Sequence, residues 1–176
     1  MDPVRKQVEI LNATTGAILA TIPTVLQPTA IALNVATHVV FVACTGSAGS
    51  VIAIDGVGKQ LLTKYTVPSG TTSISVNPVT NVVLLASQNT NTLTFIDVAS
   101  GTITTNSGTT AANARATAYA SGFFYAADTG DGDIFHEHDW LGIGRRLYDR
   151  SSGSVRHCGI SPIGSVRVYR GKVTSR

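Results

Sequence analysis

The residues best suited to chemistry gather between positions 128 and 138. Asp128, Asp131 and Asp133 place three carboxylates within six residues of a stretch that also contains glycine. Hard cations such as Ca²⁺ prefer several oxygen ligands on a loop of this kind. The spacing differs from that of an EF-hand, and no glutamate follows at the distance that such a hand requires. The stretch therefore fits either a Ca²⁺ site or an ordinary acidic turn.

A second candidate metal site follows it, at His136-Glu137-His138. Residues i and i+2 of a β-strand share a face, so the two imidazoles could hold one transition metal such as Zn²⁺. Two ligands do not complete a zinc site, and a third would have to come from another part of the chain. The alternative is an outer, partly exposed strand, in which polar side chains lower the stability of the fold only slightly.

Other catalytic patterns are absent from the sequence. It contains no nucleophile elbow, phosphate-binding loop or dinucleotide fingerprint. Cys44 and Cys158 lack the spacing of a zinc or haem motif, and they form either one disulfide or two buried free thiols. We therefore expect no catalytic residues and no cofactor, with Ca²⁺ or Zn²⁺ as the alternative if the acidic or histidine cluster binds metal.

Composition indicates a folded domain rich in short strands. The chain has 176 residues, of which 43% are hydrophobic and only 13% are charged. This balance excludes a disordered protein, and the abundance of Thr, Val, Ser and Gly suits strands joined by tight turns. The first residues do not form a secretory signal, and no apolar run is long enough to span a membrane as a helix.

Charge is distributed unevenly along the chain. Residues 1–140 carry five Lys/Arg and nine Asp/Glu, whereas residues 141–176 carry eight Lys/Arg and one Asp. A basic end can attract an anionic partner or can pack against another part of a protein. Binding of nucleic acid usually needs aromatic residues interleaved with the basic ones, and only Tyr148 and Tyr169 lie among them. We do not expect nucleic acid as the partner.

A repeat of about 42 residues organises most of the chain. Segment 51–55 (Val-Ile-Ala-Ile-Asp) recurs at 93–97 (Leu-Thr-Phe-Ile-Asp), and a looser copy lies at 8–12. A second phrase, Ile-Ala-Leu-Asn at 31–34, recurs as Ile-Ser-Val-Asn-Pro at 74–78. A fixed period of this length is typical of stacked-repeat folds.

Each unit is predicted to contain four short antiparallel strands and almost no helix, from its alternation and its Gly, Pro and Asn clusters. The predicted strands are 8–12, 17–22, 29–34, 39–44, 50–55, 60–66, 72–77, 82–87, 92–97, 102–105, 114–119, 123–127, 135–139 and 145–149. Pro162 lies two periods after Pro78, so the basic tail is interpreted as a diverged first and second strand at 158–162 and 166–169. The total is sixteen strands in one domain, with well-matched units over 1–134 and a diverged basic unit over 135–176.

Four-stranded units of this length are β-propeller blades, which predicts an all-β fold with about four blades' worth of strands. The phrases at 74–78 and 96–101 (Ile-Asp-Val-Ala-Ser-Gly) resemble the YVTN-type propeller repeat of bacterial and archaeal surface proteins. The resemblance is good over 8–106 and fair to 134. It implies an extracytoplasmic or cell-surface setting. It also implies a closed ring of about seven blades, for which this chain is too short.

An open ring would expose apolar blade faces and an unpaired edge. Three arrangements remain open. The chain could close as a four-bladed ring, with its N-terminal strand pair completing the last blade. Two chains could join as a homodimer with an eight-bladed ring. The chain could also be a fragment that forms an open arc.

The first strand of each blade is expected to line a central channel, with alternate residues facing the wall and the channel. The predicted wall residues are Ile31, Leu33, Ile74, Val76, Ala116, Ala118, Cys158 and Ile160. The channel-lining candidates are Ser73, Ser75, Arg115, Thr117 and His157. Arg115 and His157 could bind a carboxylate or another anion, since arginine binds such groups with two hydrogen bonds. The alternative is a water-filled channel in which Arg115 is structural.

The leading functional hypothesis is a non-catalytic propeller that acts as a binding or scaffold module for protein or surface interactions. Fold alone does not give function. One alternative is a metal-dependent propeller enzyme of the quinoprotein-like or lactonase-like kind. The other is a truncated fragment without independent function.

Overall fold

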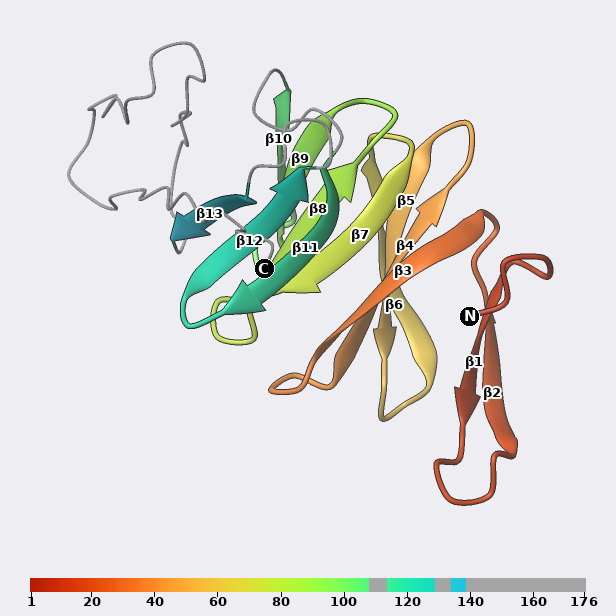
Figure 1. Ribbon diagram of the computed structural model, residues 1–176. Helices are drawn as coiled ribbons and strands as arrows, with labels where there is room; N and C mark the ends of the chain where they lie inside the picture. Colours follow the sequence, from red (N-terminus) through yellow and green to blue (C-terminus); the bar gives the residue numbers. More distant parts are fainter. Residues whose placement is uncertain (108–113, 129–133, 139–176) are drawn as a thin grey trace, which may run out of the picture.

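The computed structural model describes residues 1–107, 114–128 and 134–138, and in these ranges the chain consists of antiparallel strands and turns without helix (Figure 1). Four sheets follow one another along the chain and are called blades 1 to 4. Blade 1 consists of β1 (Gln7–Leu11) and β2 (Ile18–Pro23). Blade 2 consists of β3 (Gln27–Asn34), β4 (Val39–Thr45), β5 (Gly49–Asp55) and β6 (Gln60–Val67).

Blade 3 repeats the four-stranded order with β7 (Thr71–Val76), β8 (Val82–Ser87), β9 (Thr92–Asp97) and β10 (Thr102–Ser107). The described part of blade 4 comprises β11 (Ala114–Ala120), β12 (Phe123–Asp128) and β13 (Ile134–His138). The predicted all-β fold and blade order are confirmed. The strand predicted at 135–139 lies one residue earlier, and the strands predicted at 145–149, 158–162 and 166–169 lie outside the described residues.

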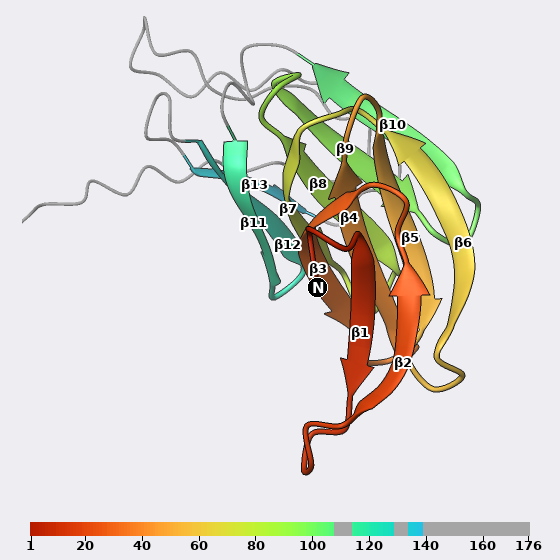
Figure 2. The same ribbon diagram turned by 90° about the vertical axis from the view of Figure 1, so that its right-hand side faces the viewer.

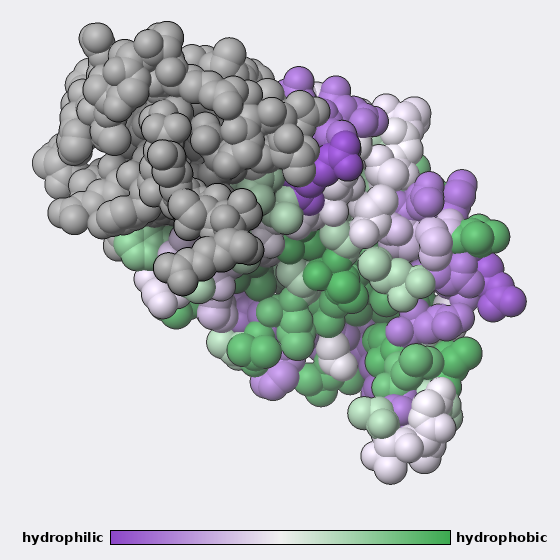
Figure 3. Space-filling model, viewed as in Figure 1, coloured by the Kyte–Doolittle hydropathy of each residue, from purple (hydrophilic) through white to green (hydrophobic). Residues whose placement is uncertain are grey.

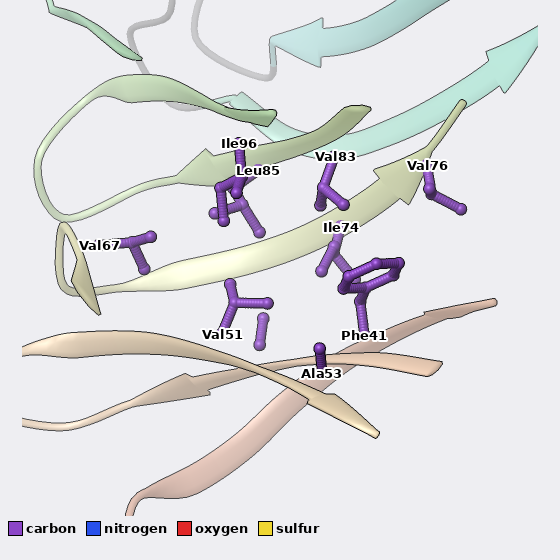
Figure 4. Close-up of a cluster of buried hydrophobic side chains, with 10 residues drawn as sticks. Phe41, Val51, Ala53, Val67, Ile74, Val76, Val83, Leu85 and Ile96 are labelled. Carbon is purple, nitrogen blue, oxygen red and sulfur yellow. The ribbon is translucent and has the colours of Figure 1, made fainter. Parts of the chain in front are cut away.

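The blades stack side by side as a fan, with β3, β7 and β11 along one side of it (Figures 1 and 2). Successive blades bury apolar side chains between their facing sides. The largest cluster lies between blades 2 and 3, where Phe41 and Val51 meet Ile74, Val83 and Leu85 (Figure 4). Removing each such side chain from water stabilises the fold by roughly 1.5–3 kcal/mol. Stacking of blades, and not any single sheet, therefore supplies the core.

The aspartate–glycine phrase of the repeat is a tight turn after the third strand. In blade 3 the Asp97 Oδ1 accepts a hydrogen bond from the Ala99 N–H at 3.0 Å, and the Gly101 N–H donates to the Asp97 carbonyl at 2.8 Å. Gly101 has a φ of 73°, a backbone conformation that glycine adopts without steric strain. The same turn forms at Asn12 and Asp55. The phrase that reveals the repeat is thus a requirement of local backbone geometry.

The register of blade 4 differs from the sequence prediction. Thr117 lies opposite Ala126, in the place that Ile74 takes opposite Leu85 in blade 3. The sequence prediction placed Ala116 on the same face as Ile74, and this was wrong by one residue. The cause is the β11–β12 turn, which consists of Ser121 and Gly122, whereas five residues separate β7 from β8. Because side chains alternate along a strand, a slip of one residue exchanges the two faces.

Candidate functional site

Two ends of the fan differ in character. The end called the turn end carries the short turns within the hairpins β3–β4, β5–β6, β7–β8 and β9–β10. The opposite end, called the loop end, carries the β4–β5, β6–β7 and β8–β9 connections at 46–48, 68–70 and 88–91. Most residues of these connections are polar or small, and several are exposed. The loop end therefore offers the side chains that are not already used in shaping tight turns.

The Arg115 side chain stands at the loop end, near the start of β11, and is exposed. With the Gln88 amide turned so that its oxygen faces the guanidinium, Gln88 Oε1 accepts from Arg115 Nη2 at 2.6 Å and from Nε at 3.3 Å. Gln88 itself is fixed because its N–H donates to the Gly70 carbonyl at 3.0 Å. A neutral amide thus orients the guanidinium. Because Gln88 carries no charge, this contact does not neutralise the positive charge of Arg115.

The loops beneath this pair are tied together across blades 2 and 3. The Gly70 N–H donates to Thr45 Oγ1 at 3.1 Å, and the Thr29 hydroxyl of blade 2 donates to the Thr71 carbonyl of blade 3 at 2.9 Å. Gly70 has a φ of 77°, and a Cβ there would meet the Asn89 side chain. Only glycine fits this position without strain. The loop end is therefore a connected surface in which Gln88 and Arg115 have defined positions.

Ser73 and Thr117 lie between blades and not on a free surface. Ser73 Oγ is 3.0 Å from Thr117 Oγ1 and accepts a hydrogen bond from the Thr117 N–H at 2.9 Å. Ser75 is buried, and its hydroxyl has no hydrogen-bond partner among the described residues. These three channel-lining candidates are thus placed inside the stack of blades.

The predicted division of the first strands into wall and channel was also wrong. Ala30 and Ala32 pack into the cluster between blades 2 and 3, whereas Ile31 and Leu33 are half exposed on the other face of blade 2. Alternation therefore separates the face toward the next blade from the face toward the preceding blade. The cause is that side chains leave a sheet along its normal, which points at neighbouring blades. The described residues do not close a ring, so a channel role for Arg115 stays a prediction. His157 lies outside the described residues.

The candidate metal ligands remain predictions. Asp128 ends β12, and Asp131 and Asp133 lie outside the described residues. His136 and His138 belong to β13, where their backbones are in register with Tyr125 and Phe123 of β12. In the parts of the chain that the structure describes, no three His, Cys, Asp or Glu side chains lie close enough together to hold a metal ion.

Cys44 is a buried free thiol between blades 1 and 2. Burial raises the pKa of this thiol above its ordinary value, although hydrogen bonding with Thr24 acts in the opposite direction. A thiol that resists ionisation is a poor nucleophile, so Cys44 is part of the core. Its counterpart Cys158 lies outside the described residues. Over the described ranges, no helix is present that could cross a membrane.

Comparison with known proteins identifies the fold. No family model and no curated protein sequence matches this chain. Among solved structures, it superposes on the hydrazine synthase of Kuenenia stuttgartiensis with a TM-score of 0.63 and 18% identity, over 75% of this chain and 39% of that one. The RRP9 WD40 repeats give a TM-score of 0.64 and 14% identity, over 75% of this chain and 42% of that one. U3-55K gives a TM-score of 0.58 and 12% identity, over 76% of this chain and 46% of that one.

These likenesses show a β-propeller fold. The chain spans less than half the length of each of these solved structures. One of the three is named as an enzyme and another by its WD40 repeats, so the fold by itself does not choose a function. The sequence had indicated Arg115 as a candidate. Its partner Gln88 was missed, because a glutamine in a polar loop carries no signal until blades 3 and 4 are stacked.

Proposed function

We propose that this chain is a non-catalytic β-propeller binding module of the YVTN type, which acts in an extracytoplasmic or cell-surface setting and binds a protein. The repeat phrases at 74–78 and 96–101 support the type and the setting. Its partner is either a different protein or a second copy of the chain. The binding surface for a different protein is the loop end, and its specific contact is a carboxylate of the partner at Arg115.

The observation that carries the loop-end proposal is the contact between Arg115 and Gln88. An amide oxygen orients the guanidinium through two donors, and none of the described carboxylates forms a salt bridge with it. Arginine binds carboxylates with two parallel hydrogen bonds, and pre-orientation lowers the entropy lost on binding. The exposed neighbours Asn89 and Thr90 add neutral hydrogen-bonding groups. Such a surface suits an acidic protein segment.

The test compares two synthetic peptides that differ only in charge, one with two glutamates and one with two glutamines. Fluorescence anisotropy at low ionic strength should show tighter binding of the glutamate peptide to the wild-type chain. Arg115→Gln should lower the ratio of the two peptides' affinities about tenfold, as expected for the loss of a charged hydrogen bond. Gln88→Glu should remove it as well, because a carboxylate would then neutralise the guanidinium.

Arg5→Gln is the matched control. Arg5 is also exposed, but it lies in the N-terminal segment beside Asp2, at 3.7 Å. Its substitution should leave the preference for the glutamate peptide unchanged. Equal affinity of the wild-type chain for the two peptides would contradict the proposal, and so would a preference that survives Arg115→Gln.

A further inference from the structure

One tripeptide of the sequence has the pattern of an acceptor site for N-linked sugar. Asn12-Ala13-Thr14 matches Asn-X-Ser/Thr with an X other than proline, and no other asparagine in the sequence does so. The asparagine amide of such a site carries the sugar, and the hydroxyl two residues later belongs to the pattern that the transferase recognises. So short a pattern also arises by chance, so its value depends on where the fold places these two side chains.

The fold places this tripeptide at an exposed tip. It lies in the turn between β1 and β2, at the turn end of the fan (Figure 1). Residues 13–16 are all exposed, and the tip stands out from the rest of the surface in Figure 3. The equivalent turns at 57–59 and 99–101 are exposed as well, although blades 2 and 3 each pack between two other blades. Exposure thus follows from the place of this turn at the end of a blade.

Local hydrogen bonds leave the Asn12 amide nitrogen available. Asn12 Oδ1 accepts from the Thr14 N–H at 2.9 Å and from the Thr15 N–H at 3.0 Å. The oxygen is therefore engaged within the turn, whereas Nδ2 donates to none of the described residues. Asn34 shapes a turn in the same way, but it is fully buried and its Nδ2 donates to Asn81. Of these two turn-forming asparagines, Asn12 is the one whose nitrogen an enzyme can reach.

The two threonines of this turn differ in what their hydroxyls do. Thr15 Oγ1 accepts a hydrogen bond from the Ala17 N–H at 3.3 Å and so helps to shape the turn. The Thr14 side chain is exposed, and its hydroxyl has no hydrogen-bond partner among the described residues. The hydroxyl that the acceptor pattern requires is therefore the one that the turn does not use.

The repeat shows that the turn itself needs only an oxygen acceptor. Asp55 and Asp97 hold the place of Asn12 in blades 2 and 3. Their Oδ1 atoms accept from the N–H groups two residues later, at 2.9 Å and 3.0 Å. Aspartate and asparagine both form turns of this kind. The amide in blade 1 thus adds a nitrogen for which the turn has no need.

We infer that Asn12 is an attachment site for an N-linked oligosaccharide. The reaction joins Asn12 Nδ2 to the anomeric carbon of the first sugar and breaks the bond from that carbon to a phosphate oxygen of a lipid-linked donor. The lipid phosphate leaves with the electron pair, and the amide proton passes to a base of the transferase. The inference rests on the extracytoplasmic setting of the proposed function, because such acceptor sites are used in secreted proteins.

An oligosaccharide on Asn12 leaves the proposed binding surface open. Arg115 and Gln88 lie at the loop end, whereas Asn12 lies at the turn end. N-linked sugar is bulky and hydrophilic, so it shields the turn end from other proteins. Modification of Asn12 would therefore direct a protein partner to the loop end.

The test uses the folded full chain, a purified oligosaccharyltransferase that accepts Asn-X-Thr, and its lipid-linked donor. Intact-mass spectrometry should show one added oligosaccharide, and peptide mapping should place it on Asn12. Asn12→Asp should abolish the addition and keep the turn, because aspartate forms the same turn in blades 2 and 3. Thr14→Ala should abolish it too, whereas Thr14→Ser keeps a hydroxyl and should retain it.

Thr15→Ala is the matched control, since it removes a threonine hydroxyl of the same turn but lies outside the tripeptide. It should accept the oligosaccharide as the wild-type chain does. The transferase is first shown to be active on a peptide of residues 9–17. Transfer to this peptide and not to the folded chain would overturn the inference, and so would transfer that survives Thr14→Ala.

The chain isolated from the surface of its own cells should carry the oligosaccharide on Asn12, as measured by mass spectrometry of its peptides. An unmodified Asn12 in that material would overturn the inference and leave the proposed function intact, since the peptide assay at Arg115 does not involve Asn12. Recovery of the chain from the cytoplasm alone would contradict the proposed setting, and the inference with it.

Discussion

The Asn34 Nδ2 donates a hydrogen bond to Asn81 Oδ1 at 2.8 Å and so joins the turns of blades 2 and 3. The same side chain shapes its own turn, because Asn34 Oδ1 accepts from the Ala36 N–H at 2.9 Å. Asn34 is fully buried, with 0% exposure. A single amide thus fixes a turn with one atom and the spacing of two blades with the other.

Replacing Asn34 should therefore cost more than replacing an asparagine that only shapes a turn. Asn34→Ala removes both functions and leaves Asn81 without this donor, so we expect a loss of about 2–3 kcal/mol in the free energy of unfolding. Asn12→Ala is the control, because the Asn12 side chain accepts the equivalent turn hydrogen bonds, from the Thr14 and Thr15 N–H groups, within its own blade. Its loss should stay below about 1 kcal/mol. Urea unfolding at pH 7 measures both, and equal losses would contradict the role given to Asn81.

The pair Ser73 and Thr117 should contribute to the stacking of blades 3 and 4. Their hydroxyls lie 3.0 Å apart across the interface. In a double-mutant cycle with Ser73→Ala and Thr117→Val, we expect a coupling energy of about 0.5–1 kcal/mol. Unfolding in urea gives the four stabilities that the cycle needs. Strictly additive effects would mean that the two side chains do not interact in solution.

Asp97 should make stability sensitive to acid. A hydrogen bond from the Ser100 hydroxyl, at 2.7 Å, and a further one from the Ala99 N–H hold the pKa of the Asp97 carboxyl below its ordinary value. A lowered pKa stabilises the fold while the carboxyl is ionised, and this contribution is lost as the pH falls through the folded-state pKa, below about pH 4. Asp97→Asn should flatten the loss of stability between neutral pH and about pH 2.

The asparagine variant keeps the turn, since Asn12 occupies the corresponding place in blade 1. Asp97→Ala is the contrast, because it removes the acceptor at every pH and should lower stability across the whole range. Thermal unfolding followed by circular dichroism at a series of pH values measures both variants. If stability falls as steeply with falling pH in Asp97→Asn as in the wild-type chain, Asp97 is not the source of the acid sensitivity.

The sequence by itself determined the period and, over the described residues, the positions of the strands to within a few residues. These features depend on local interactions. Alternating apolar residues define strands such as β8 and β9, and the Asp97–Gly101 turn follows from an aspartate acceptor and a residue with positive φ. Neighbouring residues along the chain contain that information, so it can be recognised before any blade is stacked.

Only the tertiary structure decided which face each residue takes and what it meets there. The β11–β12 turn is shorter than its counterpart in blade 3, so Thr117 and not Ala116 stands where Ile74 does. A period of two residues does not reveal such a slip. In the same way, Ile31 and Ile74 follow one pattern and differ sevenfold in exposure, 50% against 7%. Burial depends on which strands of a neighbouring blade lie opposite a side chain, and no local pattern encodes that.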